Sequence, residues 1–412
     1  MSDGPSRSPN LHSGAPFWLV RNGMADARPA LNERAHCDVV IIGAGVTGAL
    51  LADSLTSAGL DVIVIDKRET GAGSTAASTA LLQYEIDLEL TTLTEKVGAA
   101  HASRAYLASA AAVASVSDLA MTLGGCDLQP RASLYLASTR RDARRLEREV
   151  EERAALGIAA EWWPKRDVSH RYGFPSHGAI RSTLAADVDA LQLTRRLLER
   201  AAARGARWYE QTGARAYEER APGVRVLTTT GASIDARRAI CATGYDVPDF
   251  LLQDRVALHS SYALATHRLP HFGPWDDRCL VWESARPYCY MRTTTDRRII
   301  IGGEDVPFRD ATWRDRLLPT KTRKLESRLR ALLPTLETET AFEWAGTFAE
   351  TPDGLPYIGE NPNFPGMLFA MGYGGNGITF SAIAARVLTA TCLDQVDPDA
   401  ALFRMDRQQR SK

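Results

Sequence analysis

The pattern of apolar and polar positions near the start of the chain indicates a strand, a turn and a helix. Residues 39–42 form an unbroken β-branched run, Val-Val-Ile-Ile, which is typical of a parallel strand covered on both faces. Apolar residues at helical spacing follow from residue 46, and a second strand pattern, Leu-Asp-Val-Ile-Val-Ile, occupies residues 60–65. Two strands joined by a helix predict a parallel sheet and an α/β fold.

The turn between this strand and helix has the glycine spacing of a dinucleotide-binding site. Gly43 permits a tight turn, Gly45 lets the backbone approach a ligand, and Gly48 lets the helix pack close to the strand. The start of the helix, with Val46 and Thr47, directs free N–H groups and its positive end towards the ligand. A pyrophosphate suits such a site.

The end of the second strand strengthens this interpretation. Asp66 stands there, about twenty positions after the glycines, and Lys67 follows it. An Asp can accept hydrogen bonds from both ribose hydroxyls, and its charge would repel a 2′-phosphate. The alternative, an ordinary strand–turn–helix with chance glycines, is disfavoured because both strands and the acid are in register. These residues predict a dinucleotide site without deciding which dinucleotide binds.

The remaining pattern predicts more α/β structure and a set of antiparallel strands. Residues 257–308 alternate in strand fashion, and short strands occupy 207–234 with a glycine-containing hairpin. A buried strand near 238–242 ends in Thr243 and Gly244, where the backbone must again pass close to something. Helical spacing is found over residues 88–123, 139–153, 191–205 and 313–334.

Length and composition indicate an ordinary soluble protein with more than one domain. The chain has 412 residues, of which 45% are hydrophobic and 24% charged, with a formal net charge of −1. No global field therefore attracts nucleic acid or anionic lipid. Six scattered cysteines without a C-x-x-C pair favour a reduced intracellular protein, and no metal-ligand cluster stands out. Without a secretory signal or an apolar run of membrane-spanning length, a cytoplasmic location is expected.

A segment at 71–85 is rich in small hydroxyl residues. Such side chains can donate hydrogen bonds to phosphate or ring oxygens, although a Ser/Thr-rich connector is an equal alternative. The candidate ligands in this segment are Ser74, Thr75, Ser78 and Thr79.

The last part of the chain contains two glycine-rich motifs. One begins at Gly346 and continues to Asp353-Gly-Leu-Pro-Tyr-Ile-Gly359, where Asp353 is either functional or a turn residue bonded to its own backbone. The other is a strand, a glycine loop and a closing helix over residues 368–386. The candidate cofactor residues in this loop are Gly374, Gly375, Asn376, Gly377, Ile378 and Thr379.

Taken together, these motifs resemble the flavoprotein family of D-amino-acid oxidase, glycine oxidase and sarcosine oxidase. The resemblance spans residues 36–395 and looks closest to the bacterial branch that includes γ-glutamylputrescine oxidase, partly because of the aromatic lead around Trp18. The motifs are the Gly43–Gly48 fingerprint with Asp66, the Ala-Thr-Gly ending at Gly244, and the two C-terminal glycine motifs. The C-terminal pair is the most specific, because nicotinamide enzymes with a single Rossmann unit lack it.

The resemblance implies FAD as the cofactor and a two-domain fold. A Rossmann-like, three-layer FAD domain would hold an inserted antiparallel-sheet substrate domain. A glycine loop that opens a helix could aim N–H groups at the negative charge of a reduced flavin. The expected pieces are a lead (1–35), the FAD domain (36–124, 181–257 and 342–412) and the substrate domain (125–180 and 258–341).

The implied reaction transfers hydride from an amine-bearing carbon to flavin N5. Water would hydrolyse the imine, and oxygen would reoxidise the flavin with formation of hydrogen peroxide. Partners would be a small amine or amino acid and an electron acceptor, with no nucleic acid and no membrane. Because residues 73–83 contain neither His nor Cys and 342–380 contain no Cys, we expect non-covalent FAD. Yellow colour that stays with the acid-precipitated protein would contradict this.

The substrate side of the resemblance lies in residues 286–303, similar to the hairpin that carries a carboxylate-binding arginine in the family. Period-two alternation puts Tyr288, Tyr290 and Arg292 on one face of a strand. Arg292 would clamp a substrate carboxylate, assisted by the two Tyr hydroxyls. The alternative is a strand-end arginine paired with a surface acid. Met291 stands where many glycine-oxidase-like members have Pro.

Three other functions compete with an oxidase. They are a nicotinamide dehydrogenase, a flavin dehydrogenase that uses another electron acceptor, and a flavin-bound subunit without turnover. A flavin absorption spectrum of the purified protein would exclude a nicotinamide dehydrogenase. Bleaching of the flavin by amines would exclude a subunit without turnover.

Overall fold

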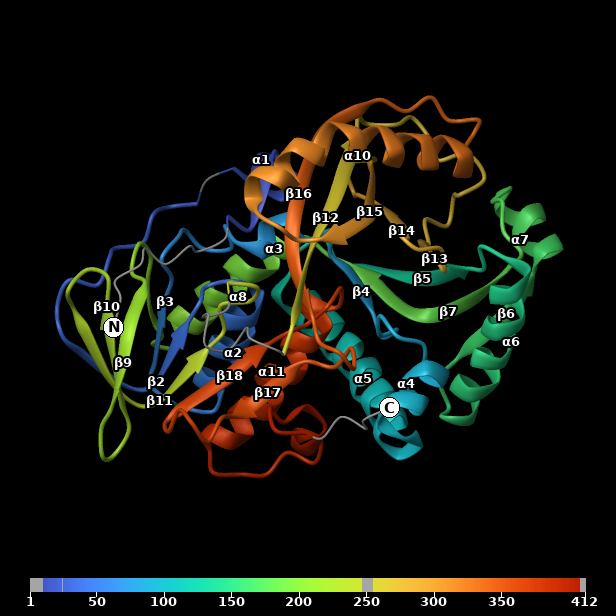
Figure 1. Cartoon of the computed structure of the whole chain (residues 1–412). Coiled ribbons are helices and arrows are strands. Elements are labelled where there is room, and N and C mark those ends of the chain that lie inside the picture. The colour runs from blue at the N-terminus through green and yellow to red at the C-terminus, as the bar shows by residue number, and fades with distance from the viewer. Residues whose placement is uncertain (1–9, 24, 247–254, 408–412) are drawn as a thin grey trace.

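Two β-sheets organise the chain, and each takes its strands from several separated segments. The structure, a computed structural model, describes residues 10–23, 25–246 and 255–407. Both sheets in Figure 1 mix colours from early, middle and late parts of the chain. The predicted α/β class is confirmed.

The first sheet has eight strands and carries the glycine fingerprint near its centre. Its main order is β17–β18–β11–β2–β3–β8, and all neighbours in it are parallel except β17 and β18. An antiparallel hairpin, β9 and β10, continues from β11. The bounds are β2 Ala35–Ile42, β3 Val62–Ile65, β8 Arg207–Tyr209, β9 Ala214–Glu219, β10 Val224–Thr228, β11 Ser233–Cys241, β17 Tyr357–Glu360 and β18 Met367–Met371.

Both faces of this parallel sheet are covered, which explains its unbroken apolar strands. Ile41 packs into the core shared with the helices, whereas Val40 packs with Val226 of the hairpin. The result is three layers: helices, parallel sheet and hairpin. The helices here are α2 Val46–Ser57, α4 Leu90–Val97, α5 Ala99–Leu123, α8 Ala190–Ala203 and α11 Gly377–Cys392, with the short α3 Ser74–Ala77 beside them and a 3₁₀ turn at Ala400–Phe403.

The second sheet has ten strands and is antiparallel except for one pair. Its order is β1–β16–β12–β15–β14–β13–β5–β7–β4, with β6 also paired to β7. The parallel pair is β5 and β13, where two distant chain segments meet. The bounds are β1 His12–Gly14, β4 Leu81–Gln83, β5 Gln129–Leu136, β6 Ala160–Pro164, β7 Gly178–Asp187, β12 Ala257–Thr266, β13 Leu280–Glu283, β14 Cys289–Thr293, β15 Ile299–Pro307 and β16 Thr340–Glu350.

Three polar helices pack around this second sheet. α10, Ala311–Leu332, lies against β12, β15 and β16, above the sheet in Figure 1. α6, Arg140–Ala155, begins at a capping box between Thr139 and Asp142, as its sequence pattern allows. α7, Lys165–Tyr172, ends at the left-handed Gly173.

The N-terminal lead belongs to the folded body from residue 10 onward. β1 pairs with β16, and α1, Phe17–Asn22, buries Phe17 and Trp18. The aromatic residues of the lead are therefore part of the folded core. Two of the expected domain boundaries, 180 and 341, fall inside strands β7 and β16 of the second sheet.

One described helix, α5, is long and apolar enough by length and composition to cross a membrane. The expectation that no apolar run reaches the length of a membrane span was wrong for α5. The hydropathy of this helix comes largely from small alanines. Tyr106 and Val113 lie on its buried side, whereas Arg104 and Asp118 lie on its exposed side. This two-sided pattern is that of a helix packed on a protein core.

Candidate functional site

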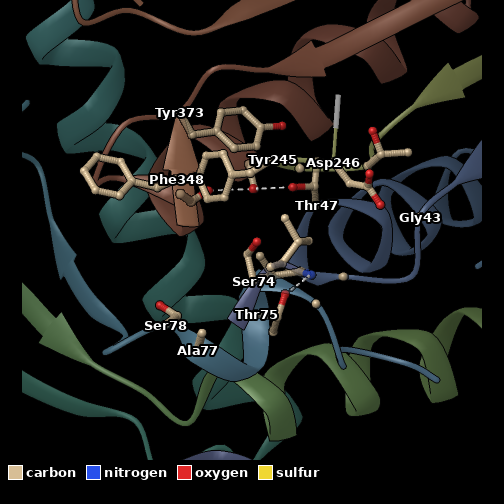
Figure 2. Close-up of a pocket in the computed structure, with 18 of the residues that line it drawn as sticks. Gly43, Thr47, Ser74, Thr75, Ala77, Ser78, Tyr245, Asp246, Phe348 and Tyr373 are labelled. Atoms are coloured by element: carbon tan, nitrogen blue, oxygen red, sulfur yellow. Dashed lines mark hydrogen bonds between the residues drawn. The ribbon is translucent and has the colours of Figure 1, made fainter. Parts of the chain in front are cut away.

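A cavity of about 750 Å³ lies where the two sheets meet. Its volume is in the range of cofactor and ligand sites. In Figure 2, Ser74, Ala77 and Ser78 lie across the pocket from Tyr245, Phe348 and Tyr373. The predicted cofactor residues all line this cavity except Gly48 and Thr379.

The glycine fingerprint brings helix α2 close to strand β2. A Cβ atom on Gly48 would lie 1.8 Å from the Gly43 carbonyl oxygen, so only glycine fits there. Gly43 has a φ of +119°, and a Cβ on it would lie 2.4 Å from the Ala242 oxygen. Gly48 therefore acts behind the cavity wall, and it places the uncapped N-terminus of α2 at the cavity.

The end of strand β3 supplies the charged part of the wall. Asp66 accepts hydrogen bonds from the backbone N–H groups of Ala44, at 2.7 Å, and Arg68, at 2.8 Å. Burial raises the pKa of Asp66, and these N–H groups oppose that rise. Lys67 and Arg68 both form ion pairs with Asp246 at this end of the cavity.

The predicted hydroxyl segment forms the opposite wall, and two indoles hold it. Trp18 Nε1 donates to the Ser78 carbonyl at 2.7 Å, and Trp344 Nε1 donates to the Ala77 carbonyl at 2.9 Å. The buried hydroxyl of Ser74 has no hydrogen-bond partner among the described residues. A free donor beside an uncapped helix end fits a phosphate-bearing cofactor.

Thr75 ties this segment to the helix start. Its Oγ1 accepts a hydrogen bond from Val46 N at 3.0 Å, marked in Figure 2. We expect Thr75→Val to weaken FAD binding about 10-fold, near 1.4 kcal/mol, because the Val46 N–H loses its acceptor and the wall shifts. Flavin fluorescence titration measures this, and Thr75→Ser, which keeps the hydroxyl, should bind as the wild type does. Equal loss in both variants would contradict a hydroxyl effect.

The C-terminal glycine loop is only partly free to face a cofactor. Gly374 N donates to the Ala349 carbonyl at 2.9 Å, and Gly375 N donates to Asp87 Oδ2 at 2.6 Å. These two N–H groups are therefore already bonded within the protein, whereas the loop was expected to aim N–H groups at a reduced flavin. Helix α11 begins at Gly377, and its N-cap residue Asn376 makes no side-chain cap, so the first turn keeps its positive end.

Thr379 was also expected among the cofactor residues, and it does not line the cavity. Its Oγ1 donates instead to the Gln83 carbonyl of β4 at 3.0 Å. That bond joins α11 to the second sheet, so Thr379 positions the loop from behind.

Strand β14 and the residue before it contribute the predicted tyrosines. Tyr288 and Tyr290 both line the cavity, with ring centroids 5.8 Å apart. Burial raises the pKa of both phenols, so they remain protonated hydrogen-bond donors at neutral pH.

Arg292 does not reach the cavity, and its predicted role as a carboxylate clamp is wrong. The side chain is 1% exposed and pairs with the fully buried Asp187 at 2.8 Å. Its Nη1 donates to the carbonyls of Thr79, Ala80 and Val188. The alternation correctly put Arg292 on the face of Tyr290, but Trp18 of α1 covers that end of the strand, 5.4 Å from the guanidinium.

Asp353 takes the structural role that the sequence left open. Its Oδ1 accepts from Leu355 N at 3.1 Å, which is a turn bond to its own segment. Arg407 also donates to both carboxylate oxygens.

Sequence reasoning missed an acidic pair on the cavity wall. Glu85 and Asp87 follow β4 and line the cavity, and Asp87 interacts with Tyr288. The only signal in the sequence was the presence of two acidic residues after the hydroxyl segment. The position of Glu85 and Asp87 in the fold depends on how β4 pairs with β7. Tyr245, which donates to the Gly374 carbonyl at 2.6 Å, was missed for the same kind of reason.

Comparisons with known proteins match most of the length of this chain. The family described as "DAO: FAD dependent oxidoreductase" matches residues 38–391. A glycine oxidase of Geobacillus kaustophilus (strain HTA426) is 26% identical over 388 residues, covering 90% of this chain and 97% of that protein. A gamma-glutamylputrescine oxidoreductase of Escherichia coli (strain K12) is 23% identical and covers 87% and 84%. The crystal structure of glycine oxidase from Geobacillus kaustophilus has a TM-score of 0.77 at 23% identity, covering 91% and 99%.

Proposed function

This chain belongs to the family of FAD-dependent oxidoreductases, and we propose that it oxidises the C–N bond of an amine or an amino acid. Its cofactor is FAD. One observation carries the proposal: a dinucleotide wall from the first sheet and a tyrosine wall from the second sheet share a single cavity. A substrate between these walls would meet the reactive end of the cofactor.

The residues that would hold FAD come from separated segments. The N-terminus of α2 and the Ser74 hydroxyl suit the pyrophosphate, Asp66 suits the ribose, and the first turn of α11 suits the ring. Bound FAD supplies the hydride acceptor for a nitrogen-bearing carbon, after which water hydrolyses the imine and oxygen or another acceptor takes the electrons.

The chain itself contributes orientation and exclusion of water. Tyr288, Tyr290 and Trp282 line the substrate end with aromatic surface, which leaves little room for bulk solvent. The protonated phenols can donate to a polar group of the substrate. Hydride transfer needs the neutral amine, so a substrate that arrives as an ammonium ion must first lose a proton, and the carboxyl groups of Glu85 and Asp87 on the cavity wall could accept it.

We propose that FAD is held without a covalent bond. Among the described residues that line the cavity, Cys241 is the one cysteine, and burial raises the pKa of its thiol. A protonated thiol is a weak nucleophile, so it is poorly suited to attack a flavin ring.

Anaerobic mixing of the purified protein with a panel of amines and amino acids tests the function. We expect the yellow flavin band to bleach with at least one member, and admission of air should then restore the band and form hydrogen peroxide. A band that bleaches but recovers only with an added dye would indicate a dehydrogenase. A bound flavin that no compound bleaches, while dithionite does bleach it, would overturn the proposed oxidation.

A further inference from the structure

The substrate end of the cavity is acidic and aromatic. Among the described residues that line it, the cationic ones are Lys67, Arg68 and Arg215, which all belong to the first sheet and its connections. The charged residues beside the second sheet are Glu85 and Asp87. Because Asp66 and Asp246 also line the first-sheet end, that end carries both signs of charge, whereas the charged lining residues described at the other end are both acidic.

Asp87 is the acid best placed to meet a ligand. Its Oδ2 accepts from Gly375 N at 2.6 Å, which fixes the carboxyl beside the C-terminal glycine loop. The Asp87 side chain packs tightly against the loop, because a Cβ atom added to Gly374 would lie 2.3 Å from Asp87 Oδ2. The charges that act on this carboxyl include those of Glu350 and Arg286, and Asp305 also interacts with it. Burial raises the pKa of Asp87 to about 6, so it is mostly ionised at neutral pH.

Glu85 provides a second, independent sign of a ligand. The residue is 4% exposed and lines the cavity, and its Oε2 has no hydrogen-bond partner among the described residues. The other carboxyl oxygen, Oε1, lies 3.5 Å from Arg153 Nη1, so this ion pair involves only one of the two oxygens of Glu85. A buried carboxylate oxygen without a donor is costly, and a cationic donor in the cavity would satisfy it.

Aromatic rings complete this end of the cavity. Trp282, Tyr288, Tyr290 and Phe308 line it from the second sheet, and Tyr245 lines it from the end of β11. The faces of aromatic rings attract cations, and most strongly where water is excluded. Acids together with aromatic walls are a combination that binds ammonium groups.

Among the described residues that line this end, no cationic side chain is placed to grip a carboxylate. Arg292 is fully engaged with Asp187 and backbone carbonyls, away from the cavity. Arg286 is exposed outside the cavity lining, with its guanidinium 4.8 Å from the Tyr288 ring centroid. His259 also lies outside the lining, and burial lowers its pKa, which leaves it neutral.

From these observations we propose that the enzyme selects amines that lack a carboxylate on the reacting carbon, with Asp87 as the counter-charge of the ammonium group. This inference rests on the proposed C–N oxidation and names its substrate class. A carboxylate on the reacting carbon would share this end of the cavity with Asp87, and like charges there repel.

A binding experiment on the FAD-loaded enzyme tests the recognition without turnover. Tetramethylammonium and propionate are titrated separately while the flavin absorption spectrum is recorded. We expect tetramethylammonium to perturb the spectrum and propionate not to. In Asp87→Asn the amide oxygen can still accept from Gly375 N, but the charge is gone, so tetramethylammonium affinity should fall at least 10-fold. The matched control Asp276→Asn, at an exposed ion pair with Arg171, should leave it unchanged.

The pH dependence of that binding distinguishes charge from shape. Affinity of the wild type for tetramethylammonium should fall as the pH drops through 6, because Asp87 becomes protonated. Asp87→Asn should lack this step. The hydrogen-bond donors to Asp87 are Gly375 N–H and Asn376 Nδ2, and the charged or titratable groups that interact with it are Glu350, Arg286, Asp305, Tyr245 and Tyr288. A step of equal size in both proteins would assign the titration to another group and overturn the role of Asp87.

Turnover is then compared in matched pairs that differ only in the carboxylate: phenethylamine with phenylalanine, cadaverine with lysine, and isobutylamine with valine, using both enantiomers of each amino acid. Within each reactive pair we expect the amine to bleach the flavin at least 10-fold faster.

Faster bleaching by the amino acids would overturn this inference while upholding the proposed function. Tetramethylammonium binding without bleaching by any compound would overturn the proposed function and uphold the recognition. Propionate binding tighter than tetramethylammonium overturns the inference in either case.

Discussion

Replacement of Arg292 by alanine should cost about 3–5 kcal/mol of folding free energy, with a lower thermal midpoint as the observed result. The side chain is 1% exposed and forms an ion pair with Asp187, whose side chain has no exposure. Arg131 also pairs with Asp187, at 2.6 Å, so removal of Arg292 leaves the buried carboxylate half compensated. It also removes the guanidinium donor from the Val188 carbonyl and from the Ala80 carbonyl, which keeps only the Val188 N–H at 3.4 Å.

The same change should weaken FAD binding, although Arg292 does not touch the cavity. Its Nη1 holds the carbonyls of Thr79 and Ala80, at the end of the hydroxyl segment that forms one wall. We therefore expect a less stable protein that loses flavin on heating before the wild type does. Differential scanning fluorimetry, which follows both the flavin and the tryptophans, measures the two events.

The matched control for this prediction is Arg268→Ala, near the edge of the same sheet. The Arg268 side chain is 66% exposed and lies 3.4 Å from Asp296, so its loss should cost less than about 1 kcal/mol. If Arg292→Ala kept the wild-type thermal midpoint but raised the KM of a carboxylate substrate, the carboxylate clamp would have to be reinstated.

The comparison of Arg292 with Gly43 shows what the sequence can and cannot predict. The glycine fingerprint is local, since strand, turn and helix are adjacent in the chain and their geometry follows from a few residues. Alternation along β14 correctly assigned the face of Arg292, but it carried no information about what covers that face. Trp18, which stands 274 positions earlier in the chain, does so.

Asp87 was missed for the opposite reason. No local pattern surrounds it, and its place beside Gly375 arises from the pairing of β4 with β7 and from the packing of α11. The Rossmann-like part could be predicted from the sequence because each strand–helix unit buries apolar residues that are adjacent in the chain. The substrate end of the cavity was not, because it is built by contacts between distant segments.

This division also bears on specificity within the family. The cofactor wall is local in sequence and constrained by backbone geometry, so substitutions there should remove the cofactor altogether. The substrate wall is assembled from side chains of β12, β13, β14 and the segment after β4, which can change without disturbing the cofactor wall. Charge at Asp87 is one such adjustable feature.

Gly48→Ala should yield a folded protein largely without FAD. The added Cβ would lie 1.8 Å from the Gly43 carbonyl oxygen and 3.0 Å from its carbonyl carbon, and both are backbone atoms that cannot rotate away. Helix α2 must therefore move off strand β2, and its N-terminus leaves the position from which it faces the pyrophosphate. With about 3 kcal/mol of strain, FAD affinity should fall about 100-fold.

The control for this prediction is Gly59→Ala, just after the same helix. Gly59 has a φ of +83° but no atom within 4 Å of an added Cβ, so alanine there costs about 1–2 kcal/mol of backbone strain without displacing α2. The flavin-to-protein absorbance ratio after gel filtration, followed by titration with added FAD, compares the two variants. Full flavin content in Gly48→Ala would show that the helix tolerates displacement, and the N-terminus of α2 would then lose its assigned role in holding the cofactor.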